Sequence, residues 1–144
     1  MVHALQQVHR LLKPNGRLIE IHPTTGALAE IHCAGIITFS APVPAYDVED
    51  IYHAEQALAH VIQGGLFGVE GVSEFDFRTY GSSVTELWEF VAEASAFDNS
   101  PLDEEVALER QELAARVEGL MRKIGNGAEV AYYEKARITR LAPL

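Results

Sequence analysis

The sequence predicts an α/β fold, with α+β as the alternative class, because helix-like and strand-like segments are interspersed along it. Apolar residues recur with a helical period in four segments, and other segments carry β-branched or alternating apolar residues. The chain of 144 residues has the size of one domain and can bury a sizeable core. No repeat or low-complexity linker interrupts it, so residues 1–144 are interpreted as a single domain.

The first two predicted elements are joined by a short turn. Residues 2–12 are expected to form a helix with one buried face, made by Leu5, Val8, Leu11 and Leu12. Lys13-Pro14-Asn15-Gly16 ends that helix, since proline lacks an N–H and Asn-Gly favours left-handed turn geometry. The apolar run within residues 17–22 then predicts a strand that is covered on both faces.

The middle of the chain predicts a hairpin followed by a helix. Residues 28–33 and 36–40 are expected to pair, with Ala34-Gly35 as their turn. The second helix runs from about residue 50 to residue 63 and is closed by Gly64-Gly65.

A glycine-rich stretch, residues 64–71, precedes the next predicted strand. Because the stretch follows a helix, it is not a strand-to-helix nucleotide loop, and its glycines are interpreted as turn punctuation. The strand is expected at residues 72–80, where Phe75 and Phe77 alternate with charged residues.

Two consecutive helices and a long strand complete the predicted order. Ser83-Val84-Thr85-Glu86 matches a capping box, so the third helix is expected to start at Ser83. The fourth is expected to start at Ser100-Pro101, with Asp103-Glu104-Glu105 near its positive dipole end. It stops at Gly125-Asn126-Gly127, and the closing strand spans residues 129–141.

The composition argues against several classes of partner and site. The chain carries 21 acidic and 11 basic residues, and its formal net charge of −10 repels nucleic acid and anionic membranes. No apolar run approaches the ~18–20 residues that span a bilayer, and the first residues lack the pattern of a signal peptide. The single cysteine, Cys33, excludes an internal disulfide and a zinc ribbon and fits a reducing cytoplasm.

The segment Ala4–Leu18, ALQQVHRLLKPNGRL, resembles a phrase common in class I S-adenosylmethionine-dependent methyltransferases. In that family a helix ending in the pattern hRvLKPGGrl leads into the fifth strand of the sheet. Asn15 stands in place of the first glycine, and Asn tolerates the same left-handed turn. Gly65-Leu66-Phe67 resembles the segment before the sixth strand. Residues 128–141 resemble the closing seventh strand, which in the family runs antiparallel between strands five and six.

The resemblance implies a partial Rossmann-like sheet, with equivalents of strands 5, 7 and 6 packed against helices. It also implies the substrate-side, C-terminal half of a methyltransferase. The family binds S-adenosylmethionine through a glycine-rich loop after strand one and an acidic residue ending strand two, both upstream of the Lys-Pro phrase. No cofactor-binding residue or metal ligand is therefore assigned. The chain alone is expected to bind no cofactor and to be inactive, and an N-terminal half is a candidate partner.

Three substrate-side candidates lie at the end of the first predicted strand. The resemblance implies that residues just after the fifth strand face the substrate, which selects His22, Thr24 and Thr25. His22 is a candidate base or substrate contact. The alternative is a turn histidine that is hydrogen-bonded to the backbone.

Other polar residues are interpreted as structural. His32 and Cys33 are neighbours that point to opposite faces of a strand, which is poor geometry for a shared site. His53 and His60 lie on one helix face but two turns apart, too far for chelation. Three aromatic residues could in principle line a binding site, but they are expected in the core or in an interface instead. They are Trp88, Tyr132 and Tyr133.

The strand at residues 17–22 is expected to leave one edge unpaired, because the family's fourth strand would pair there. Natural proteins cover such edges, so self-association through the first helix and this strand is expected. A non-enzymatic homodimerising α/β module that binds a small ligand is therefore the alternative function. A metal- or cofactor-dependent enzyme that uses the histidines is the third.

Overall fold

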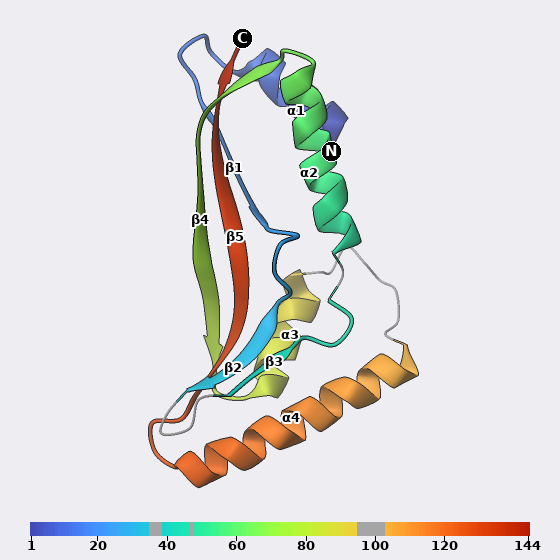
Figure 1. The fold of residues 1–144 in the computed structure, drawn as a ribbon, viewed down its shortest axis with the longest axis vertical. Helices are drawn as coiled ribbons and strands as arrows, with labels where there is room; N and C mark the ends of the chain where they lie inside the picture. The colour runs from blue at the N-terminus through green and yellow to red at the C-terminus, as the bar shows by residue number, and fades with distance from the viewer. Residues whose placement is uncertain (35–38, 47, 95–102) are drawn as a thin grey trace. The chain divides into compact units, whose positions relative to one another are not determined.

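A computed structural model describes residues 1–34, 39–46, 48–94 and 103–144 of the chain. These residues form a mixed α/β fold of four helices and five strands (Figure 1). None of these helices is both long and apolar enough to cross a membrane. In chain order the elements are α1 (Val2–Leu11), β1 (Leu18–Pro23), β2 (Glu30–Ala34), β3 (Phe39–Pro42), α2 (Glu49–Gln63), β4 (Phe67–Gly81), α3 (Val84–Ala94), α4 (Glu104–Ile124) and β5 (Glu129–Pro143).

Strand β5 organises the sheet, because three other strands pair with it. The strand order is β1-β5-β2-β3, and β4 also pairs with β5. β1 runs antiparallel to residues 136–141 of β5, and β2 runs antiparallel to residues 129–133. β4 and β1 lie along opposite edges of β5, so that β5 is the middle strand of these three (Figure 1).

The predicted hairpin is confirmed by the pairing of β2 with β3. The two strands are antiparallel, with Glu30 opposite Pro42 and Cys33 opposite Phe39. The predicted turn at Ala34-Gly35 lies partly outside the described residues. Among the described residues, the hairpin joins the sheet through the pairing of β2 with β5.

The chain divides into two compact units, and both β4 and β5 contribute residues to each of them. Unit 1 consists of residues 1–27, 47–76 and 135–144, and unit 2 consists of residues 28–46 and 77–134. Unit 1 contains α1, β1 and α2, whereas unit 2 contains β2, β3, α3 and α4. That all 144 residues form a single domain stays a prediction.

The turn between α1 and β1 has a different geometry from the one expected. The Gly16 N–H donates to the Lys13 carbonyl at 2.8 Å, which closes the turn. Neither Asn15 nor Gly16 has a positive φ, so the expected left-handed conformation is wrong. The turn is nevertheless close at position 16, since a Cβ there would lie 3.0 Å from the Lys13 carbonyl oxygen and 2.9 Å from the movable Leu12 Cδ2.

The core of unit 1 forms where α1 and α2 pack on β1, β4 and β5. Leu5 is the buried residue of α1, as the helical spacing predicted, and Leu18 of β1 packs against the same cluster. On the opposite face of β1, Ile19 and Ile21 are exposed. The expectation that this strand is covered on both faces is therefore wrong for the described residues. The buried members of this cluster are Leu5, Leu58, Val61, Phe67 and Leu141.

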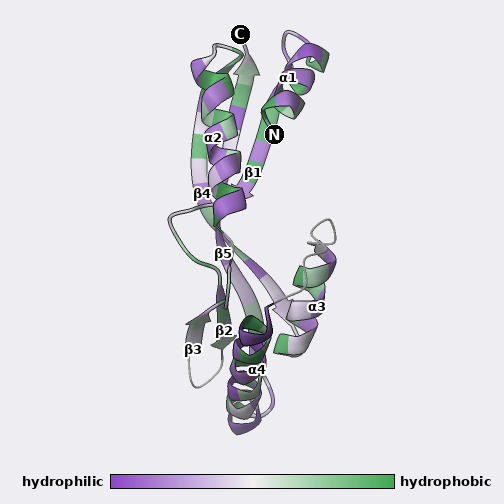
Figure 2. Ribbon diagram, turned by 90° about the vertical axis from the view of Figure 1, so that its right-hand side faces the viewer, coloured by the Kyte–Doolittle hydropathy of each residue, from purple (hydrophilic) through white to green (hydrophobic). Residues whose placement is uncertain are grey.

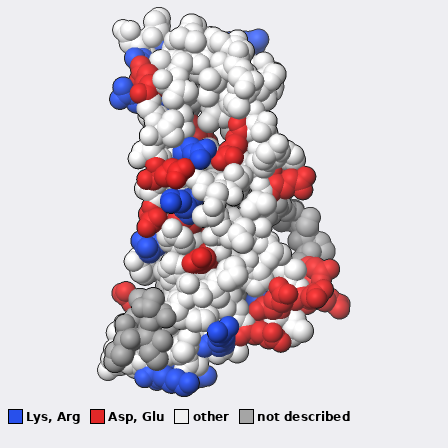
Figure 3. Space-filling view, in the orientation of Figure 1, with Lys and Arg blue, Asp and Glu red and all other residues white. Residues whose placement is uncertain are grey.

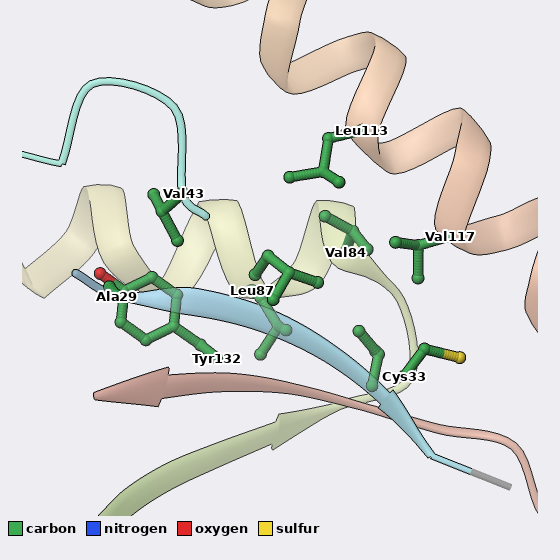
Figure 4. Close-up of a cluster of buried hydrophobic side chains, with 10 residues drawn as sticks. Ala29, Cys33, Val43, Val84, Leu87, Leu113, Val117 and Tyr132 are labelled. Atoms are coloured by element: carbon green, nitrogen blue, oxygen red, sulfur yellow. The ribbon is translucent and has the colours of Figure 1, made fainter. Parts of the chain in front are cut away.

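The core of unit 2 lies between its sheet and the helices α3 and α4. Figure 4 shows side chains from β2, β5, α3 and α4 converging on one space. Figure 2 shows hydrophilic and hydrophobic residues mixed along α4, as expected for a helix with one buried face. The largest aliphatic and aromatic members of this core are Ile31, Val43, Val84, Leu87, Leu113, Val117, Val130 and Tyr132.

Strand β4 starts earlier than its amphipathic pattern indicated. Gly64 caps α2 and Gly65 has a φ of +73°, so these two glycines do form the turn. Residues 67–71 then belong to the strand, and the interpretation of the whole stretch 64–71 as a turn is wrong. Phe67 is fully buried in the core of unit 1, and this burial accounts for the early start.

The helix caps follow the predicted chemistry, with two differences of position. The Ser83 hydroxyl accepts from the Glu86 N–H at 3.1 Å, but the Glu86 carboxylate turns to the N–H and hydroxyl of Ser82. Helix α4 begins at Glu104 with Asp103 as its N-cap, and the Asp103 carboxylate accepts from the Glu105 N–H at 2.8 Å. The expected start at Ser100-Pro101 falls on residues that lie outside the described ones.

Truncating a core leucine of unit 2 tests this packing. Leu87 is 1% exposed, and Leu108 on α4 is 56% exposed. We expect Leu87→Ala to lower the free energy of unfolding by about 2–5 kcal/mol, because a buried cavity replaces the side chain. The control Leu108→Ala is expected to change it by less than about 0.5 kcal/mol. Urea titration followed by circular dichroism measures both, and equal losses would contradict the described core.

Candidate functional site

His22 lies inside β1 rather than in a turn, close to the carboxyl end of the strand. Its ring is buried, and its Nδ1 is 2.6 Å from Oε1 of Glu20, two residues earlier on the same strand face. The partner of the ring is thus a carboxylate and not the backbone, so the alternative of a backbone-bonded turn histidine is wrong. A carboxylate at Nδ1 fixes the orientation of an imidazole and leaves Nε2 for other contacts.

A second carboxylate and a guanidinium complete the group around His22. Nε2 of His22 is 3.5 Å from Oε1 of Glu55, which projects from α2. Arg137 of β5 joins this carboxylate to another one, since it is 3.2 Å from Glu55 and 3.0 Å from Glu74. Helix α2 and strands β1, β4 and β5 therefore each contribute a charged or titratable side chain, all within unit 1.

The two threonine candidates have different environments. Thr24 is 2% exposed, and within the described structure its Oγ1 has no hydrogen-bond partner. Thr25 is exposed and donates from Oγ1 to Oε2 of Glu55 at 3.0 Å. Glu55 thus contacts both Thr25 and His22, which brings two of the three candidates predicted from sequence to one place.

The sequence pattern did not single out Glu20, Glu55 or Arg137. Glu20 carried one available signal, because residues i and i+2 of a strand share a face and an acidic residue there can bond to a histidine. Glu55 and Arg137 carried none. They reach His22 only because α2 packs on the sheet and β5 pairs with β1, with Arg137 directly opposite His22.

The remaining histidines and the cysteine do not form a site among the described residues. Cys33 is buried in the core, and burial raises the pKa of its thiol, which makes it a poor nucleophile. His32 faces the other way, stacks on Tyr133 at 4.7 Å and lies 2.7 Å from the Glu30 carboxylate. His53 and His60 are exposed on α2, and no group of three or more ligands in the described structure could hold a metal ion.

Charged side chains elsewhere have structural roles. Acidic side chains gather over the N-terminal end of α4, where the helix dipole favours them (Figure 3). In unit 1, Glu70 lies 2.7 Å from Arg17 and 2.8 Å from Arg140. Hydrogen bonds from these arginines lower the pKa of the Glu70 carboxyl. Arg17 and Arg140 are therefore both engaged by the Glu70 carboxylate.

Unit 2 holds a second polar cluster that the sequence did not indicate. Glu134 accepts a hydrogen bond from the Tyr46 hydroxyl at 3.0 Å and another from Tyr132. Burial nevertheless raises the pKa of the Glu134 carboxyl, because desolvation outweighs the two hydrogen bonds. Burial and the neighbouring carboxylate also raise the pKa of both tyrosine hydroxyls. These phenols therefore act as neutral hydrogen-bond donors.

The raised pKa of Glu134 predicts a pH-dependent stability. Between the ordinary glutamate pKa of 4.5 and the higher folded value, the folded state holds a proton that the unfolded state has lost. The free energy of unfolding therefore falls as pH rises through that interval. We expect the Glu134→Gln variant to lack this decrease in the free energy of unfolding. The free energy of unfolding of the variant, relative to that of wild type, should therefore increase with pH. Denaturation of both proteins from pH 4 upward measures the trend, and the exposed Glu112→Gln is the control. Parallel curves for wild type and Glu134→Gln would contradict it.

No protein-family model, curated protein or solved structure matches this chain. What bears on function is therefore the pattern of residues 4–18, the strand order and the side chains around His22.

Proposed function

We propose that this chain forms the substrate-side portion of an S-adenosylmethionine-dependent methyltransferase-like protein. The observation that carries the proposal is the position of β5, which runs antiparallel to β1 and is flanked by β1 and β4. This is the order expected for strands 5, 7 and 6 of the family's Rossmann-like sheet. The match extends to the element before it, since α1 ends at Leu11 and the Lys-Pro turn leads directly into β1.

In this proposal the residues at the end of β1 form part of the wall against which the substrate lies. Ligands of open α/β sheets bind beyond the carboxyl ends of the strands, where His22, Thr24 and Thr25 are located. His22 is oriented by Glu20 and is suited to accept a proton or a hydrogen bond at Nε2. Methyl transfer itself depends mainly on proximity and alignment of the two reactants, so positioning is the principal contribution of this wall.

The described residues do not fit the cofactor. The glycine-rich stretch 64–71 joins a helix to a strand, whereas a nucleotide loop joins a strand to a helix. When bound, S-adenosylmethionine supplies an electrophilic methyl group. In the proposed protein its contacts come from a separate N-terminal half, and the present chain alone is inactive.

Calorimetric titration tests whether the cofactor contacts come from a separate N-terminal half. We expect no binding heat when S-adenosylmethionine is titrated into the 144-residue chain alone. We expect saturable binding when the chain is joined to an N-terminal segment that carries the glycine-rich loop. Binding by the chain alone would contradict the assignment of the cofactor site, and failure of the joined protein to bind would contradict the methyltransferase proposal.

A non-enzymatic homodimerising module is the second candidate function, and the free edge of β1 favours it. In the described structure β1 pairs with β5 on one side only. On the face away from α1 and α2, Ile19 is 48% exposed and Ile21 is 57% exposed. An unpaired edge next to exposed isoleucines is a template for pairing with another strand, and a second copy offers the same edge.

Sedimentation velocity checks this self-association. We expect the wild-type chain to dimerise at micromolar concentration and Ile21→Lys to shift it toward monomer, because a charge there opposes burial of the strand face. Leu108→Lys, which places the same charge on an exposed position of unit 2, is the matched control. A monomeric wild type, or equal loss of dimer in both variants, would exclude association through β1.

A further inference from the structure

Three buried polar atoms without partners lie in a row on one face of β1 and its continuation. They are Oε2 of Glu20, Nε2 of His22 and Oγ1 of Thr24. The residues alternate along the chain, so their side chains share one face. In the described part of the chain, they account for three of the six buried side-chain atoms that lack a hydrogen bond. A buried polar atom without a partner is destabilising, so three of them on one strand face would gain free energy from a ligand with matching hydrogen-bonding groups.

The row is dominated by hydrogen-bond acceptors. In the tautomer in which Nδ1 of His22 donates to the Glu20 carboxylate, 2.6 Å away, Nε2 presents a lone pair. The nearest atom of Glu55 is another carboxylate oxygen, 3.5 Å from Nε2. A donor with two or more hydrogens can sit about 2.8 Å from both atoms and bond to each. The acceptors of this group thus select a ligand rich in N–H or O–H groups.

The charges around the row favour a cation. The carboxylates of Glu20, Glu55 and Glu74 are countered by the single guanidinium of Arg137, which leaves these four side chains with a formal charge of −2. A partly buried group with this charge attracts a positive ligand and repels an anion.

The exposed fraction of the side chains increases from His22 toward Glu74. The His22 side chain is 9% exposed and that of Glu20 is 11% exposed. The value rises to 21% for Glu55 and 42% for Glu74. Glu74 and the exposed Thr25 therefore lie on the open side of this group, and His22 and Glu20 on its buried side.

We propose that Glu20, His22 and Thr24, together with Glu55, bind a primary ammonium group. The ammonium carries three hydrogens and one positive charge, which match the acceptors and the negative charge of this group. The further step, that this amine is part of the methyl-accepting substrate, rests on the proposed function. The binding of the amine does not rest on it, because binding requires no methyl donor.

The probe is n-butylammonium chloride, titrated into the full 144-residue chain at constant ionic strength, with n-butanol as the uncharged analogue. Nitrogen-15 correlation spectra of the histidine rings report the His22 Nε2 environment directly. We expect saturable shifts of the His22 signals with n-butylammonium and none with n-butanol. Glu20→Gln is expected to weaken binding at least about tenfold, since a charge-assisted hydrogen bond is lost, and Thr24→Val is expected to weaken it less.

Glu70→Gln is the matched control. It removes the same charge from unit 1, but Glu70 pairs with Arg17 and Arg140 outside the row, so binding is expected to stay unchanged. The proposal is overturned if n-butylammonium leaves the His22 signals unmoved, if n-butanol shifts them equally, or if Glu20→Gln and Glu70→Gln bind alike. If the chain binds n-butylammonium but the joined protein does not bind S-adenosylmethionine, the ammonium site stands and the methyltransferase proposal is contradicted. If the joined protein binds S-adenosylmethionine but the chain does not bind n-butylammonium, only the ammonium site is contradicted.

Discussion

The backbone pairing of β5 is the constraint on which the other elements depend. One end of the strand pairs with β2 and the other with β1, while β4 pairs with it as well. Each compact unit therefore takes part of its sheet from the same strand. Because side chains alternate along a strand, the register of β5 against β1 decides which residues face α2, and it places Arg137 opposite His22. A shift of one residue would move Arg137 to the far face and dismantle the polar group.

The two polar clusters show how burial and charge pairing act differently on carboxylates. In unit 2, Glu134 is surrounded by neutral donors, so desolvation prevails and the pKa of its carboxyl rises. In unit 1, the carboxylates of Glu55 and Glu74 share a guanidinium, and Glu20 meets an imidazole. Of these two clusters, as far as the described residues go, the one in unit 1 combines charge with several unpaired buried atoms. That combination is typical of sites that bind or react, whereas the Glu134 cluster has the satisfied hydrogen bonds of a structural network.

The two faces of β1 lie in different environments. Leu18 packs into the core of unit 1 and His22 is held in the polar group, while Ile19 and Ile21 face away from both helices. Exposed β-branched residues beside an unpaired edge favour contact with another polypeptide. Both proposed roles use this property, since a second copy or an N-terminal half would cover the same strand. The polar face is then free to serve a ligand in either case.

The sequence by itself determined the features that arise from neighbouring residues. The helical spacing of Leu5, the stop at Gly64-Gly65 and the Ser83 cap all follow from short-range sterics and hydrogen bonding. Tertiary structure decided the features that need distant partners. Phe67 extends β4 because a core forms around it, and the turn at Gly16 closes without left-handed geometry. His22 was predicted from its place on a strand, but Glu55 and Arg137 join it only when α2 and β5 pack against β1, since residues so far apart in sequence meet only after the chain has folded.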